Sequence, residues 1–471
     1  MSVSSASSSP TAVPTGRGTA AAMVLACGGP FVSLLDVTIV NLAIPALAAE
    51  FPASALSDLA WVITSYAIVF AALLAPLGRL ADTVGRRRLY GAGLAVFTVA
   101  SAACAIAPSL ELLLVARTAQ GIGGAALVPT SLAIVLGQVA PDRRTAAIGA
   151  WAASASLAAA LGPSLGGVLV DAFGWRSVFL INLPIGICLA VVVRGATPER
   201  PGHGVPDLIG SGLLAGGIGA LVLGISQGTE WGWSSGSTAA SLAAGAVLMA
   251  GALIRSGRHP RPGLEIALWR NPTYAVANLV SVFFGVMLYP WLLLGVLFLT
   301  DVWNYSELQA GLAMTHGAVA SAVAGLIVSR RSLNPRTCVV AGSLLLAATA
   351  GVIAVTLPEE PAFLALWLPT GITCGIGIGL SSTGVSAAAA MSAPPEKFAS
   401  STGLNLTARQ IGGAVGIALL AALLTHDRGP SMSDYAAAYV LCGAAALLAG
   451  SAGIVLRVPA RPAPAVAPTA E

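Results

Sequence analysis

Long apolar runs follow one another along the chain, and only short polar stretches separate them. Each run is long enough for an α-helix to cross the hydrocarbon core of a bilayer, which takes about 20 residues. The pattern therefore predicts an all-α integral membrane protein with fourteen transmembrane helices. The predicted spans lie at residues 19–48, 58–78, 89–107, 111–138, 145–170, 177–194, 207–227, 237–255, 273–300, 309–329, 336–357, 361–390, 402–425 and 434–457.

Charged side chains are sorted between alternate connections. Counted from a cytoplasmic N-terminus, the even-numbered connections hold most of the basic residues, for example Arg86, Arg144 and Arg330. The odd-numbered connections hold mainly acids, such as Glu50 and Asp301. Cytoplasmic loops of membrane proteins are enriched in lysine and arginine. The alternation thus predicts that both termini are cytoplasmic, which requires an even number of helices.

Composition supports a membrane protein and excludes several other classes. The chain is 56% hydrophobic and only 9% charged, whereas a soluble domain is about 25% charged. No basic run is interleaved with aromatic residues, so we expect no nucleic-acid partner. The six cysteines lie in or beside apolar runs without the spacing of metal ligands, so we expect no metal site.

The segments outside the apolar runs are few. Residues 1–18 are rich in Ser, Thr, Ala and Pro, and residues 458–471 are rich in Pro and Ala, so both are predicted to be disordered tails. Residues 257–272 form the longest connection and include a short amphipathic stretch at 264–269. This composition predicts a cytoplasmic segment that lies at the membrane interface.

Asp36 lies well inside the first apolar run. A carboxylate at that depth costs at least ~2.5 kcal/mol, so such residues usually face a cavity, pair with another charge or carry protons. Arg117 enters the fourth run about 10 Å from the outer surface, and Asp36 lies about 17 Å from it, at 1.5 Å per helical residue. We hypothesise that Arg117 tunes Asp36, so that proton release and substrate binding exclude one another. The alternative is a structural Asp36 that hydrogen-bonds to Thr38 or to a neighbouring helix.

Four stretches resemble signatures of one transporter family. Residues 78–88 resemble motif A of the major facilitator superfamily, and residues 117–125 resemble its motif B with the intramembrane arginine. Residues 149–167 resemble motif C, the antiporter signature, although Ala158 replaces the usual glycine. Residues 35–45 are similar to the first-helix signature of the fourteen-helix drug:proton antiporters, family 2. The motif C positions that match are Gly149, Gly162, Pro163, Gly166 and Gly167.

The resemblance implies a major facilitator fold of two six-helix bundles, at residues 19–200 and 273–457, with an inserted helix pair at 201–256. It also implies that motif A locks and releases the cytoplasmic side during alternating access. The motif A residues are Gly78, Asp82, Gly85, Arg86 and Arg87. In the second half, Ser329 or Arg330 stands near the expected aspartate, so any lock there should be weaker.

Several other polar and aromatic residues within the apolar runs are candidates to line a substrate pocket. Aromatic rings suit planar or cationic substrates, but each ring also fits core packing or an interfacial belt. His316 is an ionisable group that a hydrogen bond in the bundle would equally explain. Arg409 lies about six residues into its predicted span, so it fits snorkelling to the surface as well as function. The candidates are Asn41, Tyr66, Trp151, Tyr289, Trp291, His316, Asn405 and Arg409.

These observations predict a proton-coupled antiporter that exports hydrophobic or amphipathic compounds, some of them cationic, from a bacterial cytoplasmic membrane. A dedicated exporter of one self-made natural product or lipid is the alternative, and an uptake symporter fits less well because of motif C. The sequence shows no Ser/His/Asp set and no metal cluster at membrane depth, which argues against an intramembrane enzyme. No P-loop is present, so ATP is not the direct energy source, and we expect no cofactor. One chain contains both bundles, which predicts a functional monomer.

Overall fold

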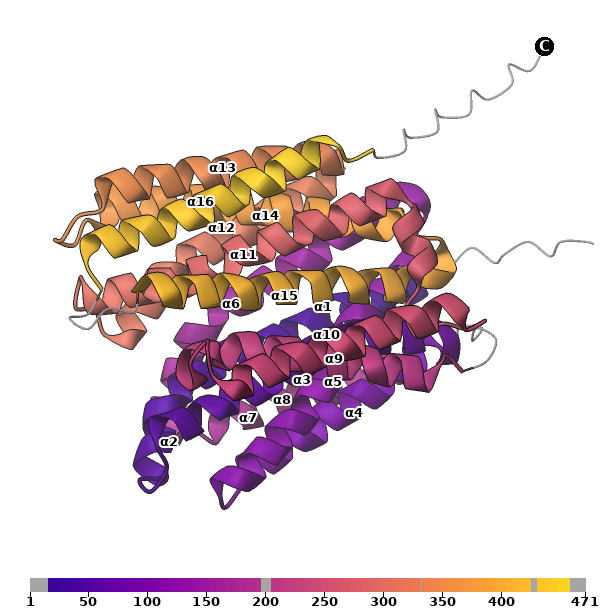
Figure 1. The fold of residues 1–471 in the computed structure, drawn as a ribbon, viewed down its shortest axis with the longest axis horizontal. Coiled ribbons are helices and arrows are strands. Elements are labelled where there is room, and N and C mark those ends of the chain that lie inside the picture. Colours follow the sequence, from indigo (N-terminus) through magenta and orange to yellow (C-terminus); the bar gives the residue numbers. More distant parts are fainter. Residues whose placement is uncertain (1–15, 196–204, 332, 425–429, 458–471) are drawn as a thin grey trace, which may run out of the picture.

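The computed structural model describes residues 16–195, 205–331, 333–424 and 430–457. Within these residues, fourteen helical segments are long and apolar enough to cross a membrane, which confirms the number predicted from the apolar runs. The regular structure of the described part is entirely helical (Figure 1). The predicted tails 1–18 and 458–471 lie outside the described residues, except that the first helix already begins at Gly16.

The N-terminal half consists of six spanning segments, two of which are interrupted helices. They pack around buried side chains that gather in two apolar clusters, one of which also includes residues of α14 and α15. The helices are α1 (Gly16–Val40), α2 (Ile44–Glu50), α3 (Leu56–Val84), α4 (Arg86–Ala105), α5 (Leu110–Gln138), α6 (Arg144–Phe173), α7 (Ser177–Leu180) and α8 (Asn182–Gly195).

The C-terminal half has six more spanning helices, and a pair of helices separates it from the N-terminal half along the chain. A buried apolar cluster rich in aromatic rings lies among α11, α12, α13, α14 and α16. The pair is α9 (Leu208–Trp231) and α10 (Gly236–Arg258). The C-terminal half holds α11 (Pro272–Asp301), α12 (Glu307–Arg331), α13 (Pro335–Thr356), α14 (Leu368–Met391), α15 (Phe398–Leu424) and α16 (Met432–Ile454).

The two halves meet along α6 with α12 and along α3 with α15. The α6–α12 contact runs the length of both helices, from Gly149 against Gly325 to Gly167 against Leu308. The contacts of α3 with α15 include Gly78, where an added Cβ would strike the backbone carbonyl of Ala399. Helices that approach this closely need residues without side chains at the crossing.

An even number of spans brings the start of α1 and the end of α16 to one end of the molecule, at the right of Figure 1. The same end carries the α3–α4 turn, the α14–α15 loop and residues 259–271, which we call the connection. We call this the basic end, because most arginines outside the spans lie there. Its cytoplasmic location stays a prediction.

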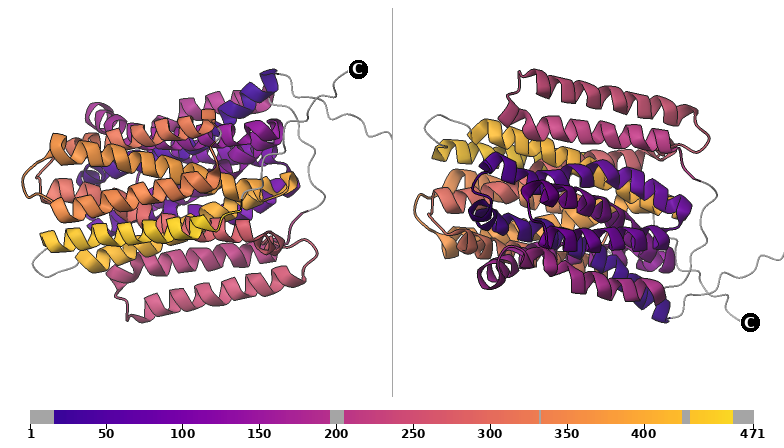
Figure 2. Two further views of the ribbon diagram at one scale, coloured as in Figure 1. Left: turned by 90° about the horizontal axis from the view of Figure 1, so that it is seen from above. Right: turned by 90° about the horizontal axis from the view of Figure 1, so that it is seen from below.

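The inserted pair lies on one flank of the molecule, as both views of Figure 2 show. Helix α9 packs against α3 and α15, and α10 packs mainly against α9. At the basic end, Arg255 of α10 binds the Asp207 carboxylate with N···O distances of 2.6 and 2.9 Å. These hydrogen bonds hold the pKa of Asp207 below its usual range. Because it packs on α3 and α15, helix α9 contacts both halves of the protein, whereas α10 contacts mostly α9.

Candidate functional site

The buried carboxylate of Asp36 is the centre of a polar cluster inside the N-terminal half. Its Oδ2 accepts a hydrogen bond from Arg117 Nη1 at 2.6 Å. Its Oδ1 accepts two more, from Gln120 Nε2 at 2.7 Å and from Asn182 Nδ2 at 2.8 Å. The side chains of Asp36 and Arg117 are 0% and 1% exposed. A charge taken fully out of water needs this kind of compensation by a counter-charge and hydrogen bonds.

Arg117 is held in one place by several neighbours on different helices. Its Nε donates to the Val62 carbonyl of α3 at 2.8 Å, and its Nη1 also donates to Gln120 Oε1 at 2.7 Å. The guanidinium carbon lies 4.5 Å from the centroid of the Tyr66 ring, within range of a cation–π interaction. The structure thus brings Asp36, Arg117 and Tyr66 together.

Two helix interruptions lie beside the acid, and the sequence explains both. The first span was predicted to be continuous, but α1 ends at Val40 and a 3-10 turn precedes α2, with Pro45 in its first turn. The sixth span breaks at Ile181, because Pro184 has no N–H to donate to the Leu180 carbonyl. The break places Asn182 at the first position of α8, where its amide reaches Asp36.

Motif A forms a contact between the halves at the basic end. Asp82 accepts hydrogen bonds from the backbone N–H and the hydroxyl of Ser400, at 2.8 and 2.7 Å. These groups belong to the first turn of α15, where the helix dipole favours a negative charge. Arg86 pairs with Asp82 at 2.9 Å and donates to the Pro395 carbonyl in the C-terminal half. Motif A therefore joins α3 to α15.

Two further motif A residues, Gly85 and Arg87, stabilise the chain reversal and the neighbouring end of α8. Gly85 has φ +106°, a conformation that L-residues rarely adopt, so glycine is required to reverse the chain between α3 and α4. Arg87 donates to the carbonyls of Val193 and Arg194 at 2.7 and 2.6 Å and so satisfies the C-terminus of α8.

The motif C residues divide between two faces of α6. Gly149, Pro163 and Gly167 face α12 of the other half. Gly162 and Gly166 face α1, where added Cβ atoms would meet Thr38 and the Ile39 backbone. The motif therefore fixes α6 closely against both the acid-bearing helix and the opposite half.

The substrate-pocket candidates of the N-terminal half lie apart from one another. Trp151 is buried in the core and donates its indole N–H to Ser131 Oγ at 3.1 Å. Asn41 is exposed in the 3-10 turn after α1, and its amide donates to the Val37 carbonyl at 3.2 Å. Tyr66 alone touches the Asp36 cluster, through Arg117.

In the C-terminal half, Arg409 lies deeper than its sequence position suggested. Helix α15 begins at Phe398 rather than near residue 402, so Arg409 is about 16 Å from its start at 1.5 Å per residue. Its guanidinium lies 5.1 Å from the Phe284 ring and donates to Ser386 Oγ at 3.3 Å. Tyr289, one turn further along α11, hydrogen-bonds to Gln410. These contacts join α11, α14 and α15 and are not those of an arginine that snorkels to the surface.

The remaining candidates of the C-terminal half have contacts that differ from those of Arg409 and from one another. Trp291 packs edge-on against Tyr439 of α16, inside the core of the half. Asn405 is buried and donates to the Ala277 carbonyl at 3.3 Å. His316 Nε2 lies 3.2 Å from the Trp367 carbonyl, at the π-helical start of the twelfth span. The structure does not gather the eight candidates into one pocket, and their role in substrate binding stays a prediction.

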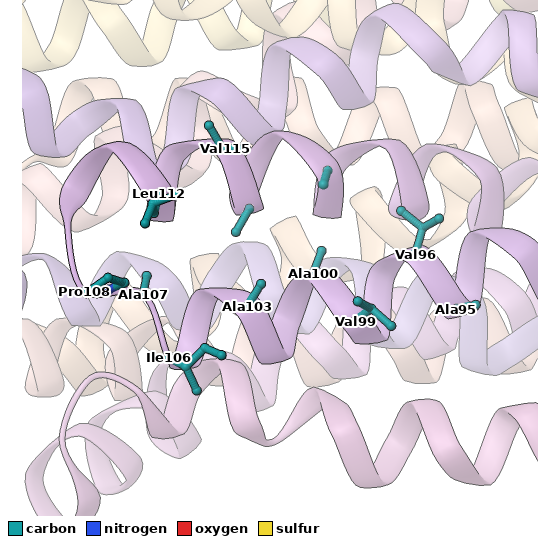
Figure 3. A pocket seen from close by; sticks show the side chains of 12 residues that line it. Ala95, Val96, Val99, Ala100, Ala103, Ile106, Ala107, Pro108, Leu112 and Val115 are labelled. Carbon is teal, nitrogen blue, oxygen red and sulfur yellow. The ribbon is translucent and has the colours of Figure 1, made fainter.

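A groove of about 690 Å³ lies between α4 and α5 (Figure 3). Its lining includes the exposed side chains Val99, Ile106 and Val115, and all twelve lining residues are apolar. None of the predicted site residues belongs to it. An apolar groove on a membrane-facing surface suits lipid chains and offers no polar group to select a substrate.

Sequence reasoning did not single out Asn182, Gln120 or Ser400 as partners of the two acids. Gln120 lies three residues after Arg117, one helical turn away, so its spacing was a usable signal. Asn182 carried a weaker signal, because Pro184 marks a helix break beside it. Among the described residues, no group of His, Cys, Asp or Glu side chains is arranged to hold a metal ion.

Comparison with known proteins identifies the family to which this chain is similar. The family model described as Major Facilitator Superfamily matches residues 26–417 and also 274–471. The multidrug resistance protein Stp of Mycobacterium tuberculosis is 35% identical over 407 residues, 84% of this chain and 74% of that protein. The methylenomycin A resistance protein of Streptomyces coelicolor is 34% identical over 90% of this chain and 89% of that protein. The cephamycin export protein CmcT of Amycolatopsis lactamdurans is 34% identical, covering 89% and 87%.

A solved structure has the same fold. The human organic anion transporter MFSD10 superposes with a TM-score of 0.65 over 93% of this chain and 99% of that chain, at 17% sequence identity. The fourteen candidate spans, the family model and the bacterial relatives together identify a multi-pass membrane transporter of a bacterial cell rather than an enzyme. The chain belongs to the Major Facilitator Superfamily, as its motifs implied, and its relatives are named for resistance to drugs or antibiotics and for antibiotic export.

Proposed function

We propose that the protein is a proton-coupled antiporter that exports hydrophobic or amphipathic compounds by alternating access. The observation that supports this best is the Asp36–Arg117 pair, which is fully buried between spanning helices. An ionisable group inside a membrane protein is costly and is kept where it binds an ion, a proton or a substrate.

The surroundings of Asp36 support an exchange between a bound proton and a bound substrate. Three donors stabilise the ionised carboxylate, so a proton that binds there must displace charge-assisted hydrogen bonds. Protonation would remove the counter-charge of Arg117 and free its guanidinium to shift against Tyr66. We therefore expect the ionised and the protonated forms of Asp36 to favour different packing of α1 against α3 and α5.

The proposed substrate class is inferred from the relatives and not from the groove between α4 and α5. Stp is named for multidrug resistance, whereas CmcT is named for export of one natural product. We propose drug export for this chain, with dedicated export of one self-made antibiotic as the second candidate. Competition between structurally unrelated compounds for export would favour the first, and export of one scaffold alone would favour the second.

Proton movement in inverted membrane vesicles tests the proposal directly. The vesicles are energised to acidify their interior, and candidate cationic drugs and dyes are added to wild type and to Asp36→Asn. We expect drug-triggered alkalinisation in wild type and its loss, by at least about tenfold, in the variant. Asn preserves the shape of the side chain, so folding is checked by purified yield and thermal unfolding. Equal responses in both proteins would move coupling away from Asp36.

A further inference from the structure

The connection between the inserted pair and the C-terminal half is a packed element and not a loose tether. Its Arg261 carbonyl accepts a hydrogen bond from Asp207 N at 2.9 Å, and its Leu264 N donates to Ser256 Oγ at 3.2 Å. Leu264 is buried, and Asn271 donates to the Ser392 carbonyl at 3.0 Å. The connection is therefore anchored to the inserted pair and to the C-terminal half.

Glu265 of the connection is a buried acid at the basic end, only 4% exposed. Its Oε1 lies 2.9 Å from Arg79 Nη1, on α3 of the N-terminal half. Its Oε2 lies 2.6 Å from Lys397 Nζ, just before α15 of the C-terminal half. Arg79 also donates its Nε to the Pro262 carbonyl at 3.0 Å. One carboxylate thus bridges two cations that belong to opposite halves.

This bridge includes Arg79 of the motif A stretch but not Asp82 or Arg86, and it acts on the same two helices. Asp82 binds Arg86 and the first turn of α15, whereas Glu265 binds Arg79 and Lys397. Both carboxylates can keep all their partners only while α3 and the start of α15 stay close. Separation of the two helices by a few ångströms would leave Glu265 with one cation and expose it to water.

We propose that Glu265 is a positioning residue of the transport cycle, which holds the basic end closed by bridging Arg79 and Lys397. The inserted pair then contributes to the gate through its connection and is more than an addition to the flank. The inference rests on the proposed function in one respect, that the protein alternates between states closed and open at the basic end.

Distance measurements between the halves test this inference. Spin labels are placed at Asp142→Cys and Arg331→Cys, both exposed at the basic end, after the six native cysteines are replaced. The full-length protein is measured in lipid nanodiscs. We expect Glu265→Gln to raise the ratio of open to closed molecules about tenfold, because one side of a buried ion-pair network is removed.

Lys397→Gln is the second variant and disturbs the fold less, because it leaves the Arg79–Glu265 pair intact. We expect a shift in the same direction, and the double variant should shift no further than Glu265→Gln alone, since the two changes remove one shared interaction. Glu265→Asp, which keeps the charge, should restore part of the closed population. Glu396→Gln is the matched control, because Glu396 is an exposed acid beside Lys397 in the α14–α15 loop.

The outcomes separate this inference from the proposed coupling. Distance distributions of Glu265→Gln and Lys397→Gln that match wild type would overturn the bridge, whatever the vesicle assay shows. If Glu265→Gln does not fold, Lys397→Gln alone decides. A shift in both variants without any drug-triggered proton movement in wild type would support the bridge and contradict proton coupling.

Discussion

Asn182 offers a way to separate hydrogen bonding from charge at the buried acid. Its amide N–H is one of three donors to Asp36, and its own Oδ1 has no hydrogen-bond partner. Replacement by the similarly sized leucine removes a donor that stabilises the ionised carboxylate. We expect drug-triggered proton movement in Asn182→Leu vesicles to fall about tenfold, the equivalent of one hydrogen bond to a charged group.

The matched control for that prediction is Asn278→Leu in the C-terminal half. Asn278 is also buried, donates to a backbone carbonyl and has an unpartnered Oδ1. Its replacement should lower thermal stability in the same way and leave drug-triggered proton movement close to that of wild type. Proton movement in Asn182→Leu equal to that of wild type, or equal losses in the two variants, would contradict a specific action on Asp36.

The contrast between charged and neutral residues also explains what the sequence could predict at this scale. Asp36 and Arg117 stand out because charge is rare within apolar runs, and the helical rise placed them at depths that differ by only about 7 Å, within reach of an arginine side chain. Asn182 and Ser400 are ordinary residues at the ends of helices, and their partners lie more than a hundred positions away. Such pairings depend on how helices meet and leave no local pattern.

At the scale of elements, the crossing of α3 and α15 makes a test of close packing. An added Cβ at Gly78 would overlap the Ala399 carbonyl, so we expect Gly78→Ala to destabilise the closed basic end by about 1–3 kcal/mol, as overpacking does. Labels at the basic end should report more open molecules. Gly351→Ala on α13 has no neighbour within 4 Å of the added atom and should leave the distribution unchanged.

Helix number and order were predictable, whereas several helix ends were not. Apolar length is a local property of the chain, and it identified all fourteen spans. The sixth span was predicted to be continuous over 177–194, but Pro184 breaks it at Ile181. The thirteenth helix begins at Phe398, four residues before the predicted 402. The apolar pattern missed its first turn because that turn contains polar residues, among them Ser400, which donates to Asp82.

At the scale of the whole molecule, contacts between the halves at different depths should respond differently to cross-linking. Ser156 Oγ and Ser321 Oγ lie 2.9 Å apart in the middle of the α6–α12 contact. Thr145 Oγ1 and Met391 Sδ lie 3.8 Å apart at the basic end. Rocking about the middle of the molecule changes the first distance little and the second greatly.

We therefore expect a disulfide between Ser156→Cys and Ser321→Cys to permit transport. A short thiol cross-linker between Thr145→Cys and Met391→Cys should abolish it, and reduction should restore it. Both pairs are made in a cysteine-free background and assayed by drug export from cells. Equal inhibition by the two cross-links would contradict a pivot at α6–α12. The sequence could not predict these contacts, because neither apolar length nor charge identifies which helices of opposite halves meet.

Lys397 is the only lysine in the chain. Its ammonium is bound to Glu265, and its side chain is about one-third exposed. Among lysine side chains, an amine-directed reagent therefore has one target, and that target is part of the proposed bridge between the halves. Chemical acylation of the unaltered protein would remove the positive charge of Lys397 and so break its bond to Glu265 without any substitution. The rate of acylation would follow the opening of the basic end.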